Sequence, residues 1–200
     1  MDPDDFYSED SRRLQRRFGT ENLAAHLSRR YVLERLEPVH MDWIRGADAV
    51  YLATVSPDGQ PECSYKGGVP GFVNVLDNRT LEIPSYDGNG MFRTLGNAVT
   101  GRVSLLFLLP RVPAKLRVNG ESEVSTDHHV TGRHVGAEAV VRVSVRQVFE
   151  NCPRYLHDPA TGEPSAHCPR PGYRPPDAAW KQKPEYDGIL PHPDSERVLE

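Results

Sequence analysis

The sequence has few cysteines and no long apolar segment. Its 3 cysteines among 200 residues are an odd number and too few for a disulfide scaffold, so we expect free thiols and a cytoplasmic protein. No apolar run reaches the length of about 18 residues that a membrane span needs. The N-terminus MDPDDFYSED is acidic and polar, unlike a signal peptide. The sequence therefore predicts neither a membrane span nor a secretory leader.

A strong charge of one sign and the common catalytic motifs are also missing. The formal net charge is -4, and no basic stripe is interleaved with aromatic residues, which argues against nucleic-acid binding. There is no GxxxxGK[ST] phosphate loop, no complete GxGxxG fingerprint and no HExxH zinc motif. No Ser/His/Asp or Cys/His arrangement and no paired carboxylates stand out, so hydrolysis has little support.

Two groups of histidines and cysteines raise a metal hypothesis, but neither has the spacing of a known site. Segment 125–138 has three histidines and few carboxylates. We expect a polar connection or a short helix there, with an acid/base histidine as the alternative: His128, His129 and His134. The second group follows the last predicted strand and is not spaced like a zinc finger: Cys152, His157, His167 and Cys168. We predict no metal site.

The residues that are present fit one globular domain, with 38% hydrophobic and 26% charged content. The run AVYLATV at 49–55 is strand-like, Ser56-Pro57-Asp58-Gly59 is a turn, and residues 60–66 form the return strand. Further strands are expected at 72–76, 80–84, 102–109, 115–124 and 139–149, with a helix at 91–99. Many short strands and one inserted helix predict a small, mostly antiparallel β-barrel.

Different structure is expected on either side of this barrel. A helical stripe predicts a helix at 21–36 that ends at Pro38, followed by a short helix that reaches Gly46. Residues 1–20 are expected to be a partly ordered arm. Of the 18 prolines, 10 lie between 153 and 193, so the tail should be extended, with Trp180 and Tyr186 as anchors. The predicted organisation is an arm and helix (1–37), a barrel domain (38–157) and a proline-rich extension (158–200).

Residues 64–97 carry the pattern that most directly suggests a ligand. Gly88, Asn89 and Gly90 precede the predicted helix, whose first amides and Arg93 favour a phosphate or carboxylate. Lys66 ends a predicted strand just before two glycines. Further small polar groups lie on neighbouring segments: Ser64, Ser85 and Asn89. The pattern indicates an anion site. The alternative is that these residues only build a turn and a solvated helix face.

Several blocks follow one another in order within residues 38–157: YLATVSPDGQPECSYKGG, GFVNVLDNRTLEIPSYDGNGMFRTLGN, LLF, LRVNG and NCPRYL. Together they resemble the pyridoxamine 5'-phosphate oxidase-like family of FMN-binding split barrels. The resemblance implies a split barrel, an FMN-dependent oxidoreductase acting on an unidentified small molecule, and a homodimer with the flavin at the subunit junction. The alternatives are a non-catalytic flavin- or haem-binding protein and a deazaflavin-dependent reductase. The substrate-specific residues of the true oxidase are not recognisable, so its own substrate is not expected.

The resemblance also implies which residues bind the cofactor. The phosphate and ribityl chain would be held by Ser64, Lys66, Ser85, Asn89 and Arg93, and the cofactor bordered by Tyr65, Tyr86 and Met91. Arg154 and Tyr155 would lie near the flavin or the substrate opening. Arg117 faces either the site or a partner carboxylate. The apolar run Leu105–Pro110 is expected to be buried on both sides, which in such a barrel a second subunit supplies.

Overall fold

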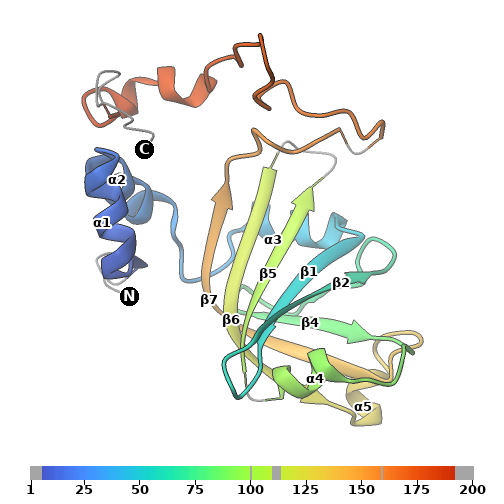
Figure 1. Ribbon diagram of the computed structural model, residues 1–200. Helices are drawn as coiled ribbons and strands as arrows, with labels where there is room; N and C mark the ends of the chain where they lie inside the picture. The colour runs from blue at the N-terminus through green and yellow to red at the C-terminus, as the bar shows by residue number, and fades with distance from the viewer. Residues whose placement is uncertain (1–5, 100, 110–113, 159, 192–200) are drawn as a thin grey trace. The chain divides into compact units, whose positions relative to one another are not determined.

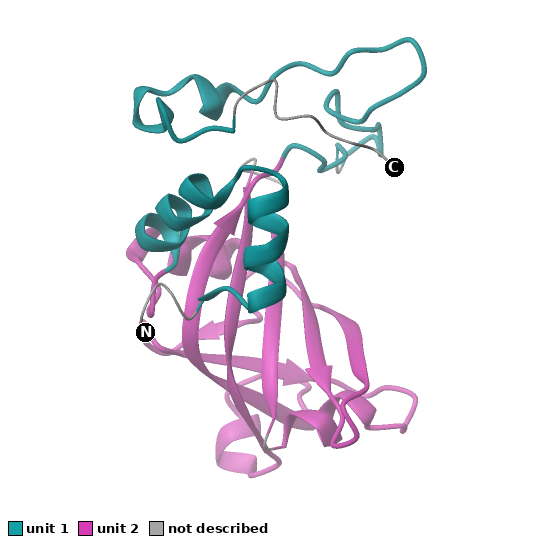
Figure 2. Ribbon diagram, turned by 60° about the vertical axis from the view of Figure 1, so that its left-hand side comes forward, with its two compact units in different colours: residues 1–32, 154–200 teal, residues 33–153 magenta. Residues whose placement is uncertain are grey.

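The computed structural model describes residues 6–99, 101–109, 114–158 and 160–191. The chain divides into two compact units, coloured separately in Figure 2. Unit 1 consists of residues 1–32 and 154–200, and unit 2 of residues 33–153. Unit 2 contains the complete sheet.

Unit 2 is built on one antiparallel sheet of seven strands that curls into a half-barrel (Figure 1). The strands are β1 (Ala49–Val55), β2 (Pro61–Gly67), β3 (Asn74–Val75), β4 (Thr80–Ser85), β5 (Arg102–Leu109), β6 (Ala114–Ser125) and β7 (Ala139–Asn151). Their order across the sheet is β2-β1-β5-β6-β7-β4-β3. This arrangement confirms the predicted split barrel with helices.

The first hairpin shows how the sequence builds the sheet. In the predicted turn, the Gln60 amide donates to Ser56 Oγ at 3.0 Å, and Gly59 takes a φ of 88°. Alternation along β1 then buries Val50 and Leu52 completely. We call the face that carries these two residues the inner face of the sheet and the opposite one the outer face.

The two longest strands, β6 and β7, pair along their length with an irregular register at Asn119 and Gly120. A Cβ atom at Gly120 would collide with the Ser144 carbonyl oxygen, so this position requires glycine. The core lies on the inner face of the sheet. Its fully buried members include Leu52, Leu105, Phe107, Leu116 and Val118.

Three helices accompany the sheet: α3 (Pro38–Gly46), α4 (Arg93–Ala98) and α5 (His128–Thr131). Pro38 begins α3, where a proline ring is compatible with the first turn, instead of ending the preceding helix as predicted. The predicted helix at 21–36 stops at Tyr31. Leu33 instead forms an isolated β-bridge with Val148, so tertiary pairing overrides the helical pattern there.

Unit 1 contains two helices, α1 (Glu9–Arg17) and α2 (Glu21–Tyr31), and an extended tail with short 3-10 turns at Ala179–Gln182 and Pro184–Tyr186. The arm is more regular than predicted, because the Ser8 hydroxyl caps α1 by accepting from the Ser11 amide. Tyr186 is buried and its ring lies 4.9 Å from that of Trp180. Tyr186 also contacts His26 and Tyr31, so it attaches the tail to α2; packing of the tail on the barrel stays a prediction. None of the described helices is long and apolar enough to cross a membrane.

Candidate functional site

Strand β2 is an edge strand and carries three of the predicted residues. Its register pairs Ser64 with Leu52 and Lys66 with Val50, so both polar side chains lie on the inner face. Tyr65 alternates to the outer face and is 62% exposed. A ligand at this edge could therefore meet side chains from both faces of the sheet.

Helix α4 adds Arg93 to this edge. Arg93 Nε donates to a Glu62 carboxylate oxygen at 2.6 Å, and its Nη2 donates to the same oxygen. Because Glu62 pairs with Thr54 in the β1–β2 register, it lies on the inner face with Ser64. The hydrogen bond to Glu62 raises the pKa of Arg93. Asn97 strengthens the connection by donating to Thr54 Oγ1 at 3.2 Å.

The segment between β4 and α4 differs from the prediction. The helix begins at Arg93 and not at residue 91, since Phe92 takes a left-handed φ of 51° that interrupts helical geometry. Asn89 accepts a hydrogen bond from the Met91 amide through its Oδ1, at 3.0 Å, so its side chain stabilises the turn. Tyr86 and Met91 are exposed. Ser85 ends β4 opposite Ala139.

On the outer face, the register aligns one row of side chains across five strands. The row runs from β2 to β7 as Tyr65, Tyr51, Leu106, Arg117 and Phe149. The two tyrosine rings pack edge to face at 5.6 Å, and the Arg117 guanidinium lies 5.9 Å from the centre of the Phe149 ring. Arg117 thus lies on the opposite face of the sheet from Ser64 and Lys66.

The apolar run of β5 is buried on one face only. Leu105, Phe107 and Leu109 lie in the core, whereas Leu106 and Leu108 are only half-buried on the outer face. The single chain thus buries one side of the run, and burial of the other side by a second subunit stays a prediction; Pro110 lies outside the described residues.

Arg154 and Tyr155 belong to unit 1. The Arg154 guanidinium lies 5.5 Å from the centre of the Tyr155 ring, and the Arg154 carbonyl accepts a hydrogen bond from the Ser165 hydroxyl. Within unit 1 these contacts form a local turn, and the expected position of the two residues near the flavin stays a prediction.

A buried carboxylate on β4 contacts three basic side chains of unit 2. Glu82 is 0% exposed and accepts hydrogen bonds from Arg133 at 2.6 Å and from Arg142 at 2.9 Å. His134 Nε2 lies 3.2 Å from its other oxygen. Burial alone would raise the pKa of Glu82, but the bonds to Arg142 and His134 and the charge of Arg133 hold it below its ordinary value. The cluster ties the segment after α5 to the sheet.

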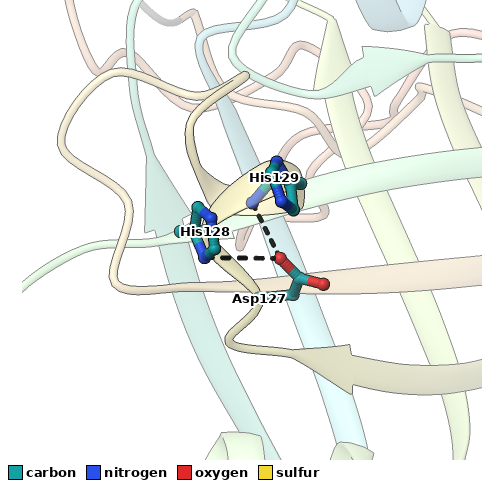
Figure 3. Close-up of side chains that lie close together, drawn as sticks. All are labelled: Asp127, His128 and His129. Atoms are coloured by element: carbon teal, nitrogen blue, oxygen red, sulfur yellow. Dashed lines mark hydrogen bonds and ion pairs between the residues drawn. The ribbon is translucent and has the colours of Figure 1, made fainter.

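The histidine-rich segment forms the short helix α5, as expected. Figure 3 shows Asp127, His128 and His129, whose potential ligand atoms lie within 4.8 Å of one another on the surface. Asp127 Oδ1 accepts from the His129 amide at 2.8 Å, so the carboxylate caps the helix. His134 is not part of this group, because it binds Glu82. Capping explains the arrangement.

In the second histidine and cysteine group, Cys152 belongs to unit 2, and the three members in unit 1 form no metal-ligand cluster among its described residues. His157 Nδ1 accepts from the Ser165 amide, while His167 Nδ1 lies 3.1 Å from the Pro176 carbonyl oxygen. All three cysteines are free, and Cys152 is exposed. The two histidines therefore have separate local roles in the tail.

Comparison with known proteins identifies the family of the half-barrel. Residues 36–152 match the model of the pyridoxamine 5'-phosphate oxidase family, which is more than half of the chain. The chain belongs to this family. The match spans every strand of unit 2 and all the predicted cofactor residues except Arg154 and Tyr155. No curated protein matches the chain.

Solved structures of several proteins are similar to this pyridoxamine 5'-phosphate oxidase family member. HupZ of Group A Streptococcus is 18% identical, with a TM-score of 0.45 over 57% of this chain and 94% of that one. A candidate pyridoxamine 5'-phosphate oxidase from Lactobacillus delbrueckii is 23% identical, with a TM-score of 0.45 over 58% and 99%. An FAD-binding protein from Mycobacterium smegmatis is 14% identical, with a TM-score of 0.40 over 60% and 97%.

Sequence reasoning missed two carboxylates that organise this family member. Glu62 lies two residues before Ser64, so both side chains are on one face of the strand. This spacing could have indicated from the sequence that Glu62 belongs to the site. Glu82 gave no comparable signal, because its partners lie 51 to 60 residues further along the chain. Only the folded sheet brings Arg133, His134 and Arg142 to it.

Proposed function

We propose that the chain binds FMN and acts as an FMN-dependent oxidoreductase on a small molecule. The observation that carries this proposal is the family match over residues 36–152, which includes the edge formed by β2 and α4. The residues there suit a phosphate ester: a hydroxyl on Ser64, an ammonium on Lys66 and a guanidinium on Arg93. These three side chains can bind a phosphate without the backbone amides of a glycine-rich helix start.

These side chains have distinct parts in the proposed site. Lys66 and Arg93 neutralise the phosphate charge, and Ser64 donates its hydroxyl. Glu62 holds the Arg93 side chain in place through Nε and Nη2, which leaves Nη1 available to an anion. The bound FMN supplies hydride or electron transfer. The chain supplies the position of the cofactor and excludes water from it.

We also propose that the protein is a homodimer that pairs through the outer face, with the flavin at the subunit junction. The supporting observation is the row from Tyr65 to Phe149, where the side chains of Tyr51 and Leu106 leave apolar surface partly exposed. Tyr65 and Arg117, both predicted cofactor residues, lie on this row. A second copy would cover the half-buried leucines of β5.

An absorbance spectrum tests the flavin proposal. Purified protein is mixed with FMN, freed of unbound flavin, and reduced with NADH or NADPH. We expect a bound yellow flavin that bleaches with one of these donors and recovers in air, because an oxidoreductase must reduce and reoxidise its cofactor. Flavin, deazaflavin and haem absorb at different positions, so the same spectrum distinguishes the alternatives.

Two results would contradict this proposal in different ways. Failure to take up FMN at micromolar concentration would remove FMN as the cofactor and leave the fold in place. FMN that binds but is reduced by neither donor and by no tested substrate would indicate a flavin-binding protein without turnover.

Replacing Arg93 with alanine tests the phosphate assignment. We expect FMN to bind about tenfold more weakly, because one charge-assisted contact is lost while the sheet is unchanged. The dissociation constant is measured by quenching of flavin fluorescence. Arg79→Ala is the matched control, since Arg79 is similarly exposed and pairs with a carboxylate, Glu34. Equal affinity of the Arg93 variant and the native chain would show that the phosphate lies elsewhere.

A further inference from the structure

A groove in unit 1 has no part in the proposed flavin chemistry. Its volume is about 470 Å³, within the range of about 300 to 1,000 Å³ that is typical of small-molecule sites. Ile189 from the tail forms one side. The other side is a single face of α2, because its lining residues recur three or four positions apart: Asn22, Ala25, His26, Arg29 and Arg30.

The groove is positively charged. Arg29 and Arg30 are both exposed in the last turn of α2, and neither forms an ion pair with another described residue. None of the six lining residues is acidic. Two guanidinium groups that line one groove can bind a phosphate or a carboxylate through several charge-assisted hydrogen bonds. The charge of the groove therefore favours an anion.

His26 lines the groove between α2 and the aromatic residues of unit 1. Its Nε2 atom is shielded from solvent and has no hydrogen-bond partner among the described residues. The ring is held in place by Tyr186 and Tyr31, whose ring centroids lie 5.5 Å and 6.4 Å away.

We propose that this groove binds a small organic anion, a phosphate or carboxylate attached to an apolar body. Arg29 and Arg30 contact the anionic group. Ala25 and Ile189 provide the apolar surface for the rest of the ligand. The site lies wholly within unit 1 and does not depend on the proposed flavin function.

Trp180 offers a direct readout, because its ring packs on Tyr186, which in turn packs on His26. The chain has 2 tryptophans, so Trp43→Phe leaves Trp180 as the sole fluorophore of this kind. Full-length Trp43→Phe protein is titrated with phenyl phosphate, benzoate and neutral benzyl alcohol at constant ionic strength. We expect saturation with at least one anion below about 1 mM and none with the alcohol. The tighter anion identifies the preferred group.

A matched pair of variants separates a site from general charge attraction. In the same background, Arg29→Gln with Arg30→Gln should weaken anion binding about tenfold. Arg16→Gln with Arg17→Gln removes the equivalent pair from the last turn of α1 and should leave binding unchanged. Calorimetry on the unaltered chain detects binding that Trp180 does not report. Equal weakening in both variants, or no saturable binding by either method up to about 10 mM, would overturn the proposal.

Discussion

Replacing Glu82 with glutamine is expected to lower the free energy of unfolding of unit 2 by about 3 kcal/mol. The substitution keeps the size of the side chain but removes the negative charge that Arg133 and Arg142 share. Because Glu82 is fully buried, water cannot reach the amide that replaces it, although Arg133 and Arg142 are 46% and 35% exposed and keep part of their hydration. Urea unfolding in a Trp180→Phe background measures the effect, since Trp43 then reports on unit 2 alone.

The control for this experiment is Glu121→Gln. Glu121 also pairs with an arginine, Arg146 at 3.0 Å, but both side chains are 59% exposed. Solvent-exposed pairs contribute little, so we expect a change of at most about 0.5 kcal/mol. If the Glu82 variant were no less stable than this control, the buried cluster would not be holding the sheet and the segment after α5 together.

The stabilisation by Glu82 should depend on pH. The folded pKa of this carboxyl lies below its ordinary value of 4.5, so the unfolded chain takes up its proton first as the pH falls. The stability difference between native protein and Glu82→Gln should be complete above pH 4.5 and decline as the pH falls towards the folded pKa. A difference that is constant down to strongly acidic pH would contradict this assignment.

Replacing Leu106 with arginine is expected to weaken the proposed dimer about 100-fold. Leu106 is in the middle of the outer-face row, between Tyr51 and Arg117, so a second positive charge would enter the centre of the interface. Analytical ultracentrifugation gives the result directly. The native chain should sediment with twice the subunit mass of 22.4 kDa, and the variant with the subunit mass. FMN affinity should fall in parallel if the flavin lies at the junction.

Val135→Arg is the matched substitution elsewhere in unit 2. Val135 is 97% exposed and follows α5, away from the outer-face row, so arginine there should change neither mass nor flavin content. A native chain that sediments as a monomer, or a Leu106 variant that remains a dimer, would disprove pairing through this face. A monomer that still binds FMN would support FMN as the cofactor and would contradict the proposal that the flavin lies at a subunit junction.

The strands could be predicted because each is bounded by local chemistry. The turn of Ser56 to Gly59 and the β-branched and aromatic residues of β1 predict the β1–β2 hairpin without tertiary information. The end of α2 could not be predicted in this way. Its helical pattern continues past Tyr31, but the pairing of Leu33 with Val148, far away in the sequence, gives the backbone an alternative set of hydrogen bonds.

The candidate site was predictable only as a list of residue types. Sequence alternation separates Tyr65 from Ser64 and Lys66, but only the sheet register shows that Tyr65 shares a row with Arg117. The glycines before α4 suggested a helix start with free amides. Phe92 instead adopts the left-handed conformation, and α4 is only 6 residues long. The spacing of apolar residues does not predict this backbone conformation.

The bridge between Leu33 and Val148 has a consequence for how this protein could have arisen. The two residues exchange backbone hydrogen bonds of 2.8 Å and 2.7 Å, so the start of unit 2 lies beside the last strand of the same unit. A domain whose ends meet can be inserted into another chain, or exchanged for a related one, without forcing its neighbours apart. Unit 2 could therefore be inserted or exchanged during evolution as one domain, while the segments on either side of it change independently.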